Sequence, residues 1–376
     1  MENAQKRCWA EISLAAIEHN YREMRSKLPT GCKFLAVVKA NAYGHGAIAV
    51  AKMLEQKGCD YIAVACLDEA EELRKAGICA PILILGPTPT ELAPRLFELK
   101  ITQAVGSLEM ALGLSKALEG SNARLKIHLK LETGMGRTGF DVKRGDVTEL
   151  LAALKLKNLY AEGIFTHFAV SDEPSREDYT ANQFKIFCES VSKIEALTGH
   201  SFEIKHCANS GAMINYPKTY LDMVRPGLAL YGLYPAAETG EISLRPALSL
   251  KARVASITEH EKGDSISYGC LFTATEKTRL AVVSIGYADG LHRILSNNMD
   301  VLIKGHRVHQ LGRICMDMCM VDITPFPDIS VNDVATIYGT DGKNLLPIEE
   351  QAAKAQTISY ELLCAISPRV PRVYID

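Results

Sequence analysis

Long apolar runs and an excess of charge of either sign are both missing from this sequence. No stretch approaches the roughly 18 uninterrupted apolar residues that a membrane-spanning helix needs, so we expect no membrane association. The opening residues, MENAQKRCWAEISL, are polar and lack the apolar core of a signal peptide, which favours a cytoplasmic location. The formal net charge of -2 gives no electrostatic drive toward nucleic acid or an anionic membrane surface. These absences leave a small molecule as the expected partner.

The cysteines lack the spacing of a metal site or a disulfide framework. There are eleven, an odd number, and they are scattered along the chain, which favours reduced thiols. Cys315 and Cys319 are the closest pair, but no further pair of Cys or His ligands lies near them in the sequence. A zinc site is therefore disfavoured, and we expect no metal.

The composition, with 47% apolar and 23% charged residues, is that of an ordinary globular protein. A chain of 376 residues is too long for one ordinary core. We therefore predict two domains, residues 1–236 and residues 237–376, separated at a shift toward Pro, Gly and polar residues in LYPAAETGEIS.

The first domain alternates short apolar runs with amphipathic stretches, the pattern of βα units around a parallel sheet. The runs are nearly all apolar, as expected of strands that are covered on both faces. They number eight, which predicts a closed (β/α)8 barrel of the TIM type: KFLAVVK, DYIAVA, PILILG, ITQAVG, LKIHLKL, LYAEGIFTHF, FEIKHC and DMVRPGLALYG. Apolar residues at three- and four-residue spacing predict helices over residues 47–56, 67–76, 108–118, 147–156 and 179–197.

The second domain is predicted to be mainly β. Its segments alternate β-branched and polar residues between turn signals, and few have a helical period: LSLKARVASI, RLAVVSIGY, VLIKGHRV and DVATIYG. The expected fold class is thus α/β, an N-terminal barrel followed by a C-terminal mainly β domain.

Polar residues at the carboxyl ends of barrel strands are the first candidates for chemistry. Lys39, Arg137, His167 and Ser210 lie at or just beyond the ends of apolar runs. Lys39 precedes the small residues ANAYGHG, and desolvation there can lower the pKa of its amine and make it a nucleophile toward a carbonyl. From its position alone, a surface lysine that ends a strand is the simpler interpretation.

The segment AVVKANAYGHG around Lys39 resembles the lysine-bearing segment of the alanine racemase family, barrel-type enzymes that depend on pyridoxal phosphate. The resemblance continues in order through nearly the whole chain, which makes it far more specific than one lysine motif. The other matching blocks are HLKLETGMGRTGF, IFTHFA, HCANSGAM, VRPGLALYG, ISYGC, SIGYADG, GRICMDMCMVD and ISYELLCAIS.

This resemblance implies that Lys39 links covalently to pyridoxal 5'-phosphate and then acts as a base. It implies a phosphate site after the seventh and eighth runs, where Ser210 and its neighbours offer a hydroxyl and N–H groups and Gly227 permits close approach. A simple helix cap is the alternative for Ser210. The implied cofactor-binding residues are Lys39, Tyr43, His167, Asn209, Ser210, Arg225, Gly227, Leu228 and Tyr360.

Arg225 resembles the residue that faces the pyridine nitrogen. A guanidinium only donates hydrogen bonds, so it would keep that nitrogen unprotonated and weaken the ring as an electron sink. This suits a racemase, which must avoid side reactions; a structural ion pair is the alternative.

Racemisation needs two bases on opposite faces of the α-carbon, and the resemblance implies Lys39 and Tyr268, the second supplied by the partner subunit of a homodimer. A free phenol has a pKa near 10, so Tyr268 needs nearby positive charge, for which His167 and Arg225 are candidates. Without the resemblance, Tyr268 would be interpreted as a core aromatic.

Further residues are implied around the substrate. Arg137 and the backbone N–H of Met316 would bind the carboxylate, and Lys130 resembles a lysine that carries a carbamate in many relatives. The supporting residues would be Lys130, Tyr287, Cys315 and Asp317, with a small side-chain pocket that favours alanine. Asp172, Arg293 and Arg313 resemble the lining of a substrate corridor, although solvent-facing salt bridges are the alternative. Glu132 and Thr138 depart from the Asp and Leu that are frequent in relatives.

Other functions remain open at this point. A racemase of broader specificity, acting on serine, lysine or arginine, differs by one or two pocket residues, and one methylene changes affinity by only about 1–3 kcal/mol. A decarboxylase on the same plan would not need the opposed lysine and tyrosine. A non-catalytic pyridoxal-phosphate carrier would lack the C-terminal β domain. The expected role is therefore interconversion of L- and D-alanine, which supplies D-alanine for peptidoglycan.

Overall fold

The computed structural model describes residues 6–235 and 242–376, which form two compact units. The barrel unit consists of Ala16–Ala42 and Ala47–Arg245, and the β-rich unit of residues 6–15, Tyr43–Gly46 and Pro246–Asp376. The predicted boundary between residues 236 and 237 lies outside the described residues. The structure differs from a single boundary because the first strand, β1 (Cys8–Ser13), pairs with two strands of the C-terminal region and so belongs to the β-rich unit.

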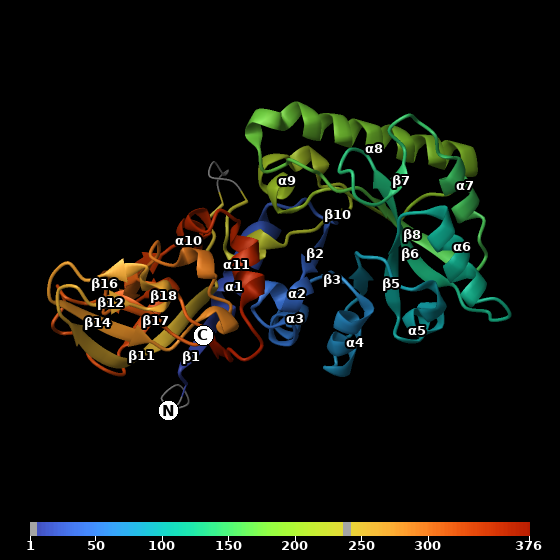
Figure 1. Ribbon diagram of the computed structural model, residues 1–376. Helices are drawn as coiled ribbons and strands as arrows, with labels where there is room; N and C mark the ends of the chain where they lie inside the picture. Colours follow the sequence, from blue (N-terminus) through green and yellow to red (C-terminus); the bar gives the residue numbers. More distant parts are fainter. Residues whose placement is uncertain (1–5, 236–241) are drawn as a thin grey trace. The chain divides into compact units, whose positions relative to one another are not determined.

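The barrel unit is an eight-stranded parallel sheet in the order β10-β2-β3-β4-β5-β6-β8-β9 (Figure 1). Its strands are β2 (Lys33–Val37), β3 (Tyr61–Val64), β4 (Ile82–Ile84), β5 (Ile101–Val105), β6 (Leu125–Glu132), β8 (Leu159–Phe165), β9 (Ile204–His206) and β10 (Met223–Val224), with the short β7 (Phe140–Asp141) beside β6. Backbone bonds close the gap between β9 and β10, from Asp222 N–H to the Lys205 carbonyl (3.0 Å) and from Arg225 N–H to the Ala208 carbonyl (2.8 Å). The prediction of eight strands is confirmed.

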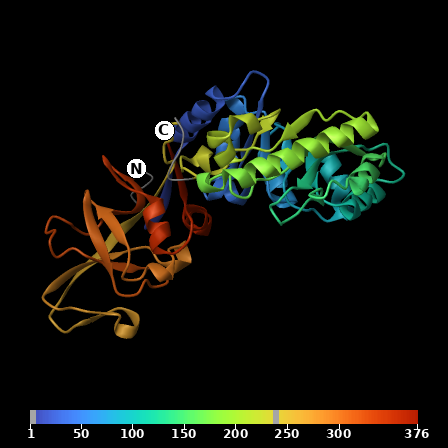
Figure 2. The same cartoon turned by 90° about the horizontal axis from the view of Figure 1, so that it is seen from above.

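Helices alternate with these strands and cover the outside of the sheet (Figures 1 and 2). They are α1 (Leu14–Ser26), α2 (Lys39–Tyr43), α3 (Ala47–Gln56), α4 (Leu67–Lys75), α5 (Ala93–Glu98), α6 (Leu108–Ala117), α7 (Thr148–Leu154), α8 (Glu177–Thr198) and α9 (Ser210–Asn215), with short 3-10 turns η2 (Thr90–Leu92), η3 (Pro174–Arg176), η4 (Pro217–Thr219) and η5 (Leu228–Tyr231). The five predicted helices correspond to α3, α4, α6, α7 and α8, while α1, α2, α5 and α9 lie outside the predicted ranges.

Local interactions explain the burial of the strands and the positions at which the helices begin and end. All four residues of β3 are buried because helices cover one face of the strand and the barrel interior the other. The Ser107 side chain caps α6 by accepting a hydrogen bond from Met110 N–H. Helix α8, the long green helix of Figure 2, ends at Gly199, whose φ of 68° is a conformation that glycine adopts at little cost.

The β-rich unit contains one large mixed sheet in the order β19-β18-β15-β16-β17-β14-β11-β1-β20. Its members are β1, β11 (Leu248–His260), β14 (Thr278–Val283), β15 (Asp300–Ile303), β16 (His306–Leu311), β17 (Cys319–Asp322), β18 (Val334–Asp341), β19 (Asn344–Leu346) and β20 (Arg372–Ile375). A separate hairpin joins β12 (Ser265–Ile266) and β13 (Phe272–Thr273), and the helical pieces are η6 (Tyr268–Cys270), η7 (Tyr287–Asp289), η8 (Arg293–Leu295), α10 (Ile348–Lys354) and α11 (Ser359–Ala365). The predicted β character of this region is confirmed.

Three further observations concern the cysteines, the helices and the possible metal ligands. None of the cysteines, all of which lie in the described part of the chain, forms a disulfide. Among the described residues, no helix is long and apolar enough to cross a membrane. The same residues contain no group of three or more His, Cys, Asp or Glu side chains that could hold a metal ion.

Candidate functional site

Lys39 follows β2 directly and begins a turn of unusual handedness. The next four residues, Ala40 to Tyr43, all have positive φ angles, between 51° and 54°. In this left-handed region each residue with a Cβ atom costs roughly 1–2 kcal/mol. Such strain persists only where surrounding contacts impose it, and it is concentrated at functional sites.

Contacts from three directions hold this turn. The Glu69 carboxylate of α4 accepts hydrogen bonds from Ala40 N–H (2.6 Å) and from Ala65 N–H at the end of β3 (2.7 Å). The Asn41 side chain accepts from Ala47 N–H (2.8 Å) at the start of α3, and Ala42 N–H donates to the Val38 carbonyl (2.7 Å). The strained turn therefore fixes where the Lys39 backbone leaves the strand.

A group of cations faces Lys39 at the carboxyl ends of the barrel strands. Burial, and then the positive charges of Arg137, Arg225 and Lys39, lower the pKa of Lys130 to about 8. Burial and the same cations hold the pKa of His167 well below its ordinary value, so that this ring is neutral. His167 thus contributes a hydrogen-bonding ring, and the arginines and lysines supply the positive potential.

The turn that carries Arg137 is organised by a carboxylate. Glu132, at the end of β6, accepts hydrogen bonds from Gly134 N–H (2.5 Å) and Arg137 N–H (3.2 Å). Burial opposes its charge, but these N–H donors outweigh burial and lower the pKa of Glu132. The Lys130 amine donates to the Thr138 hydroxyl (2.6 Å), so the two departures from the family pattern, Glu132 and Thr138, both shape this loop.

Arg225 is buried directly after β10. Its guanidinium donates to His206 Nδ1 (2.9 Å) and to the carbonyls of Thr166 (2.7 Å) and Cys207 (3.0 Å), and it lies over the Phe165 ring at 5.2 Å. Burial lowers the pKa of Arg225 to about 10, so it stays protonated near neutral pH. It forms no ion pair with any residue that the structure describes, which removes the alternative of a structural ion pair.

Sequence reasoning missed the residues behind Arg225. The His206 ring is hydrogen-bonded to the His128 ring, which is in turn hydrogen-bonded to the Glu162 carboxylate, and all three side chains are buried inside the barrel. Each lies within one of the eight apolar runs, where polar side chains at otherwise apolar positions were the available signal.

Ser210 joins the loops after β9 and β10. Its Oγ accepts hydrogen bonds from Gly227 N–H (2.8 Å) and Ala229 N–H (3.3 Å). The N-cap of α9 is Asn209, whose Oδ1 accepts from Ala212 N–H (3.0 Å), so Ser210 is not the cap that the alternative interpretation required. Within the described chain, the N–H groups of Ser210, Gly211 and Leu228 have no acceptor, which leaves a set of donors with the chemistry of an anion site.

Tyr43 and Tyr360 lie together in the β-rich unit. Their ring centroids are 5.7 Å apart with planes at 50°, and burial raises the pKa of the Tyr43 phenol. Tyr43 therefore remains a protonated donor at neutral pH.

Three loops of the β-rich unit gather the remaining predicted residues. Tyr287 N–H and Ala288 N–H donate to the carbonyls of Cys315 and Met316 (3.0 Å each), and a Cβ atom at Gly286 would collide with those carbonyls. The Ser267 hydroxyl donates to the Arg313 carbonyl (2.7 Å) and so attaches the loop that carries Tyr268. We call residues 267–270, 286–289 and 313–318 the loop cluster.

Tyr268 is 71% exposed on this cluster, so it is not a core aromatic. Asp317 is held by Arg369 (2.6 Å), which also binds the fully buried Asp289 (2.7 Å). Asp172 and Arg293 are exposed, Arg313 is half-buried, and none of the three forms an ion pair within the described residues, contrary to the salt-bridge alternative.

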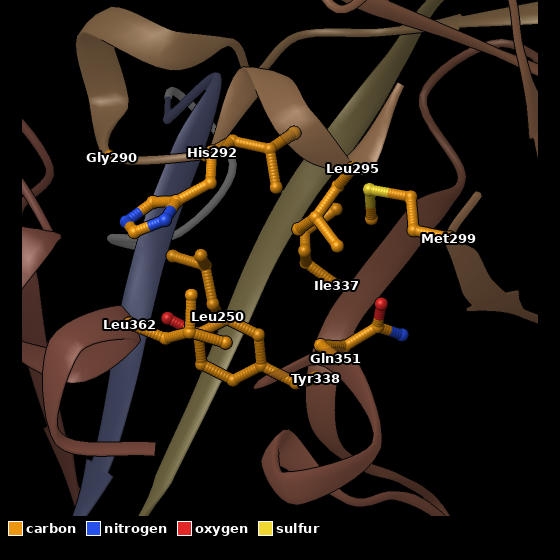
Figure 3. A pocket seen from close by; sticks show the side chains of 10 residues that line it. Leu250, Gly290, His292, Leu295, Met299, Ile337, Tyr338, Gln351 and Leu362 are labelled. Carbon is orange, nitrogen blue, oxygen red and sulfur yellow. The ribbon is translucent and has the colours of Figure 1, made fainter. Parts of the chain in front are cut away.

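The β-rich unit also contains a small pocket that none of the predicted site residues lines (Figure 3). Leu250, His292, Met299, Tyr338 and other mostly apolar side chains line it, and its free volume of about 10 Å³ has room for roughly one water molecule. It cannot hold an amino acid.

The predicted residues thus form two groups. Lys39, Lys130, Arg137, His167, Asn209, Ser210, Arg225, Gly227 and Leu228 lie in the barrel unit, whereas Tyr43, Tyr268, Tyr287, Cys315, Met316, Asp317 and Tyr360 lie in the β-rich unit.

Comparison with known proteins accounts for both units. The sequence pattern described as the N-terminal domain of alanine racemase matches residues 12–235, and that of the C-terminal domain matches residues 247–374. The alanine racemases of Desulforamulus reducens and Methanococcus maripaludis are each 44% identical over 369 residues, covering 98% of this chain and 98% of theirs.

Solved structures give the same result. The alanine racemase of Clostridium difficile 630 has 41% identity and a TM-score of 0.93, covering 99% of this chain and 96% of that one. The alanine racemase of Bacillus anthracis with bound L-Ala-P has 36% identity and a TM-score of 0.92, covering 99% and 95%. With both domains matched and both groups of residues present, this chain belongs to the alanine racemase family, whose members depend on pyridoxal phosphate.

Proposed function

We propose that this chain interconverts L-alanine and D-alanine with pyridoxal 5'-phosphate, using Lys39 and Tyr268 as the two bases. The observation that carries the proposal is the donor set at the barrel mouth. A lysine, a buried arginine without a carboxylate partner and a set of N–H groups without acceptors belong to one ring of strand ends.

These residues fit the cofactor by their chemistry. Lys39 would hold its aldehyde, and the N–H groups of Ser210, Gly211 and Leu228 with the Ser210 hydroxyl would hold its phosphate, assisted by Tyr43. Three of the five N–H donors of Arg225 are used inside the barrel, which leaves its Nε–H and one Nη1–H for the ring nitrogen. The cofactor, when bound, withdraws electrons from the amino acid and so acidifies its α-hydrogen.

The chain's own part is to move a proton between the two faces of the α-carbon. The Lys39 amine removes or returns the proton on one face, and the Tyr268 phenol does so on the other. Because Arg225 only donates hydrogen bonds, it would keep the ring nitrogen of the cofactor unprotonated and so limit the electron withdrawal by the ring.

Tyr268 reaches the site of a partner subunit in our proposal. Its exposure of 71%, beside the exposed Met316 and Tyr287, suits a loop cluster that a second copy of the chain covers. Met316 N–H has no acceptor in the described chain and would bind the substrate carboxylate with Arg137. We therefore propose a homodimer with shared sites.

Lys130 is proposed to carry a carbamate. Its depressed pKa of about 8 leaves far more neutral amine near neutral pH than an ordinary lysine has, and the neutral amine is the form that reacts with carbon dioxide. The product is an anion beside Arg137, which replaces a repulsion between cations with an attraction. The Thr138 hydroxyl, now an acceptor at 2.6 Å, can turn to donate to that anion.

The proposed setting is the cytoplasm, where reducing conditions preserve the eleven free cysteines, and the D-alanine formed would serve peptidoglycan synthesis. Alanine is the proposed substrate because Tyr287, Met316 and Tyr360 would crowd a larger side chain.

The test follows L-alanine in heavy water. Purified protein with pyridoxal phosphate should lose optical rotation and gain α-deuterium, Lys39→Ala should do neither, and Tyr268→Phe should lose inversion. Exchange without inversion by the unaltered protein would overturn the two-base proposal. Carbon dioxide release from L-ornithine, L-lysine or meso-diaminopimelate, without inversion of alanine, would indicate a decarboxylase.

A further inference from the structure

A series of hydrogen bonds between buried side chains connects Arg225 with the Glu162 carboxylate inside the barrel. Arg225 Nη1 lies 2.9 Å from His206 Nδ1, His206 Nε2 lies 2.8 Å from His128 Nδ1, and His128 Nε2 lies 3.3 Å from Glu162 Oε2. Arg225 directly follows β10, and His206, His128 and Glu162 lie in β9, β6 and β8; each of the four is no more than 4% exposed.

Only one arrangement of protons satisfies every link with neutral rings. A guanidinium can only donate, so His206 Nδ1 must accept and the His206 proton must be on Nε2. That proton is donated to His128 Nδ1, so the His128 proton is also on Nε2 and is donated to the carboxylate of Glu162. Burial, with Arg225 as a further cause, lowers the pKa of both histidines, which agrees with neutral rings.

The two ends of this chain carry opposite charges, and neither end has a better partner within the barrel interior. Arg225 otherwise contacts two carbonyls and the Phe165 ring. Glu162 also accepts from the buried Tyr61 hydroxyl (2.7 Å) and pairs with Lys126. The Lys126 side chain is 56% exposed, so water screens its charge, whereas the histidine side of Glu162 is shielded from solvent.

We propose that Glu162 is the counter-charge of Arg225, a positioning residue that acts through His128 and His206. The ionised carboxylate fixes both histidine tautomers, and the fixed rings hold the guanidinium so that its two remaining N–H donors face the barrel mouth. The relevance to catalysis rests on the proposed function, but the hydrogen-bond chain itself does not.

The first measurement needs no variant in the chain. We expect ¹⁵N chemical shifts of the cofactor-loaded protein to show both rings neutral and protonated on Nε2 from about pH 6 to about pH 8. The proton shared between His206 Nε2 and His128 Nδ1 couples the two ¹⁵N nuclei, and this coupling assigns both rings. A cationic ring, or a proton on Nδ1 of either histidine, would overturn the proposal even if every variant failed to fold.

The second measurement compares Glu162→Gln with Glu203→Gln. Glu162→Gln removes the negative charge of the carboxylate but keeps an oxygen that can accept from His128. Glu203→Gln removes an exposed carboxylate that accepts from the Tyr160 hydroxyl and takes no part in the hydrogen bonds between Arg225 and Glu162. Glu162→Gln should lower kcat by roughly two- to thirtyfold, leave KM for alanine within about twofold, and shift both the absorbance of the bound cofactor and the histidine ¹⁵N signals. Glu203→Gln should change none of these.

Equal behaviour of the two variants would overturn the proposal. If the unaltered protein racemised no alanine, the proposed function would fail instead, while the ¹⁵N shifts would still decide whether the chain of hydrogen bonds exists.

Discussion

Ser210 serves two loops with one hydroxyl, and its replacement isolates that role. In Ser210→Ala the N–H groups of Gly227 and Ala229 lose their acceptor. We expect the free energy of unfolding of the cofactor-free protein, measured in urea, to fall by about 1–3 kcal/mol, and cofactor affinity to fall as well. Ser190→Ala, at a buried position on α8, is the matched control and should change cofactor affinity little. Unchanged cofactor affinity in Ser210→Ala would contradict the proposal that Ser210 binds the phosphate.

Lys130 gives a prediction for pH. Its pKa in the fold is about 8 and its ordinary value is 10.5, so between these values the unfolded chain binds more protons than the folded chain. The free energy of unfolding therefore contains a contribution that rises as the pH increases from about 8 to about 10.5, on the order of 3 kcal/mol at most. Urea denaturation of the unmodified, cofactor-free protein should show this rise relative to Lys130→Met. Parallel pH profiles would contradict the depressed pKa.

At the scale of elements, the turn after β2 is the least expected feature. The small residues and glycines of ANAYGHG predict a tight turn, but glycine normally occupies left-handed positions, so nothing in the sequence predicted four in succession at Ala40 to Tyr43. Its geometry is imposed by tertiary contacts from Glu69 and Ala47.

Asn41 tests how the turn is held. Asn41→Ala removes the acceptor for Ala47 N–H at the start of α3 and should lower the free energy of unfolding by about 1 kcal/mol, within the range of helix caps. Asn41→Asp keeps an acceptor oxygen and should retain most of the stability. If both variants lost the same amount in urea denaturation, the contact would not be what holds the turn.

The eight barrel strands could be predicted because burial on both faces produces apolar runs, and such runs are visible in the sequence without knowledge of which strands pair. The position of Lys39 at the end of the first run followed from the same pattern. His128, Glu162 and His206 could not be assigned, because each polar residue interrupts a different run and only the closed sheet brings them into contact. The segment 301–308 became two strands, β15 and β16, because Lys304 and Gly305 turn the chain with positive φ angles.

At the scale of the whole molecule, the proposed bases belong to different units. Lys39 lies in the barrel unit and Tyr268 on the loop cluster of the β-rich unit, where Tyr287, Met316 and Met318 are also exposed. Exposed apolar side chains around a reactive phenol are expected where a second copy binds. A closed two-fold dimer would give each barrel one loop cluster from its partner.

Mixing two inactive variants tests the central claim most directly. Lys39→Ala and Tyr268→Phe are each expected to be inactive, and their heterodimers contain one site with both defects and one intact site. After the subunits are exchanged in a one-to-one mixture, racemisation of L-alanine should return to about a quarter of the activity of the unaltered protein, because half of the dimers have one intact site of two. No recovery, in a mixture shown to contain heterodimers, would contradict the claim that Lys39 of one subunit works with Tyr268 of the other.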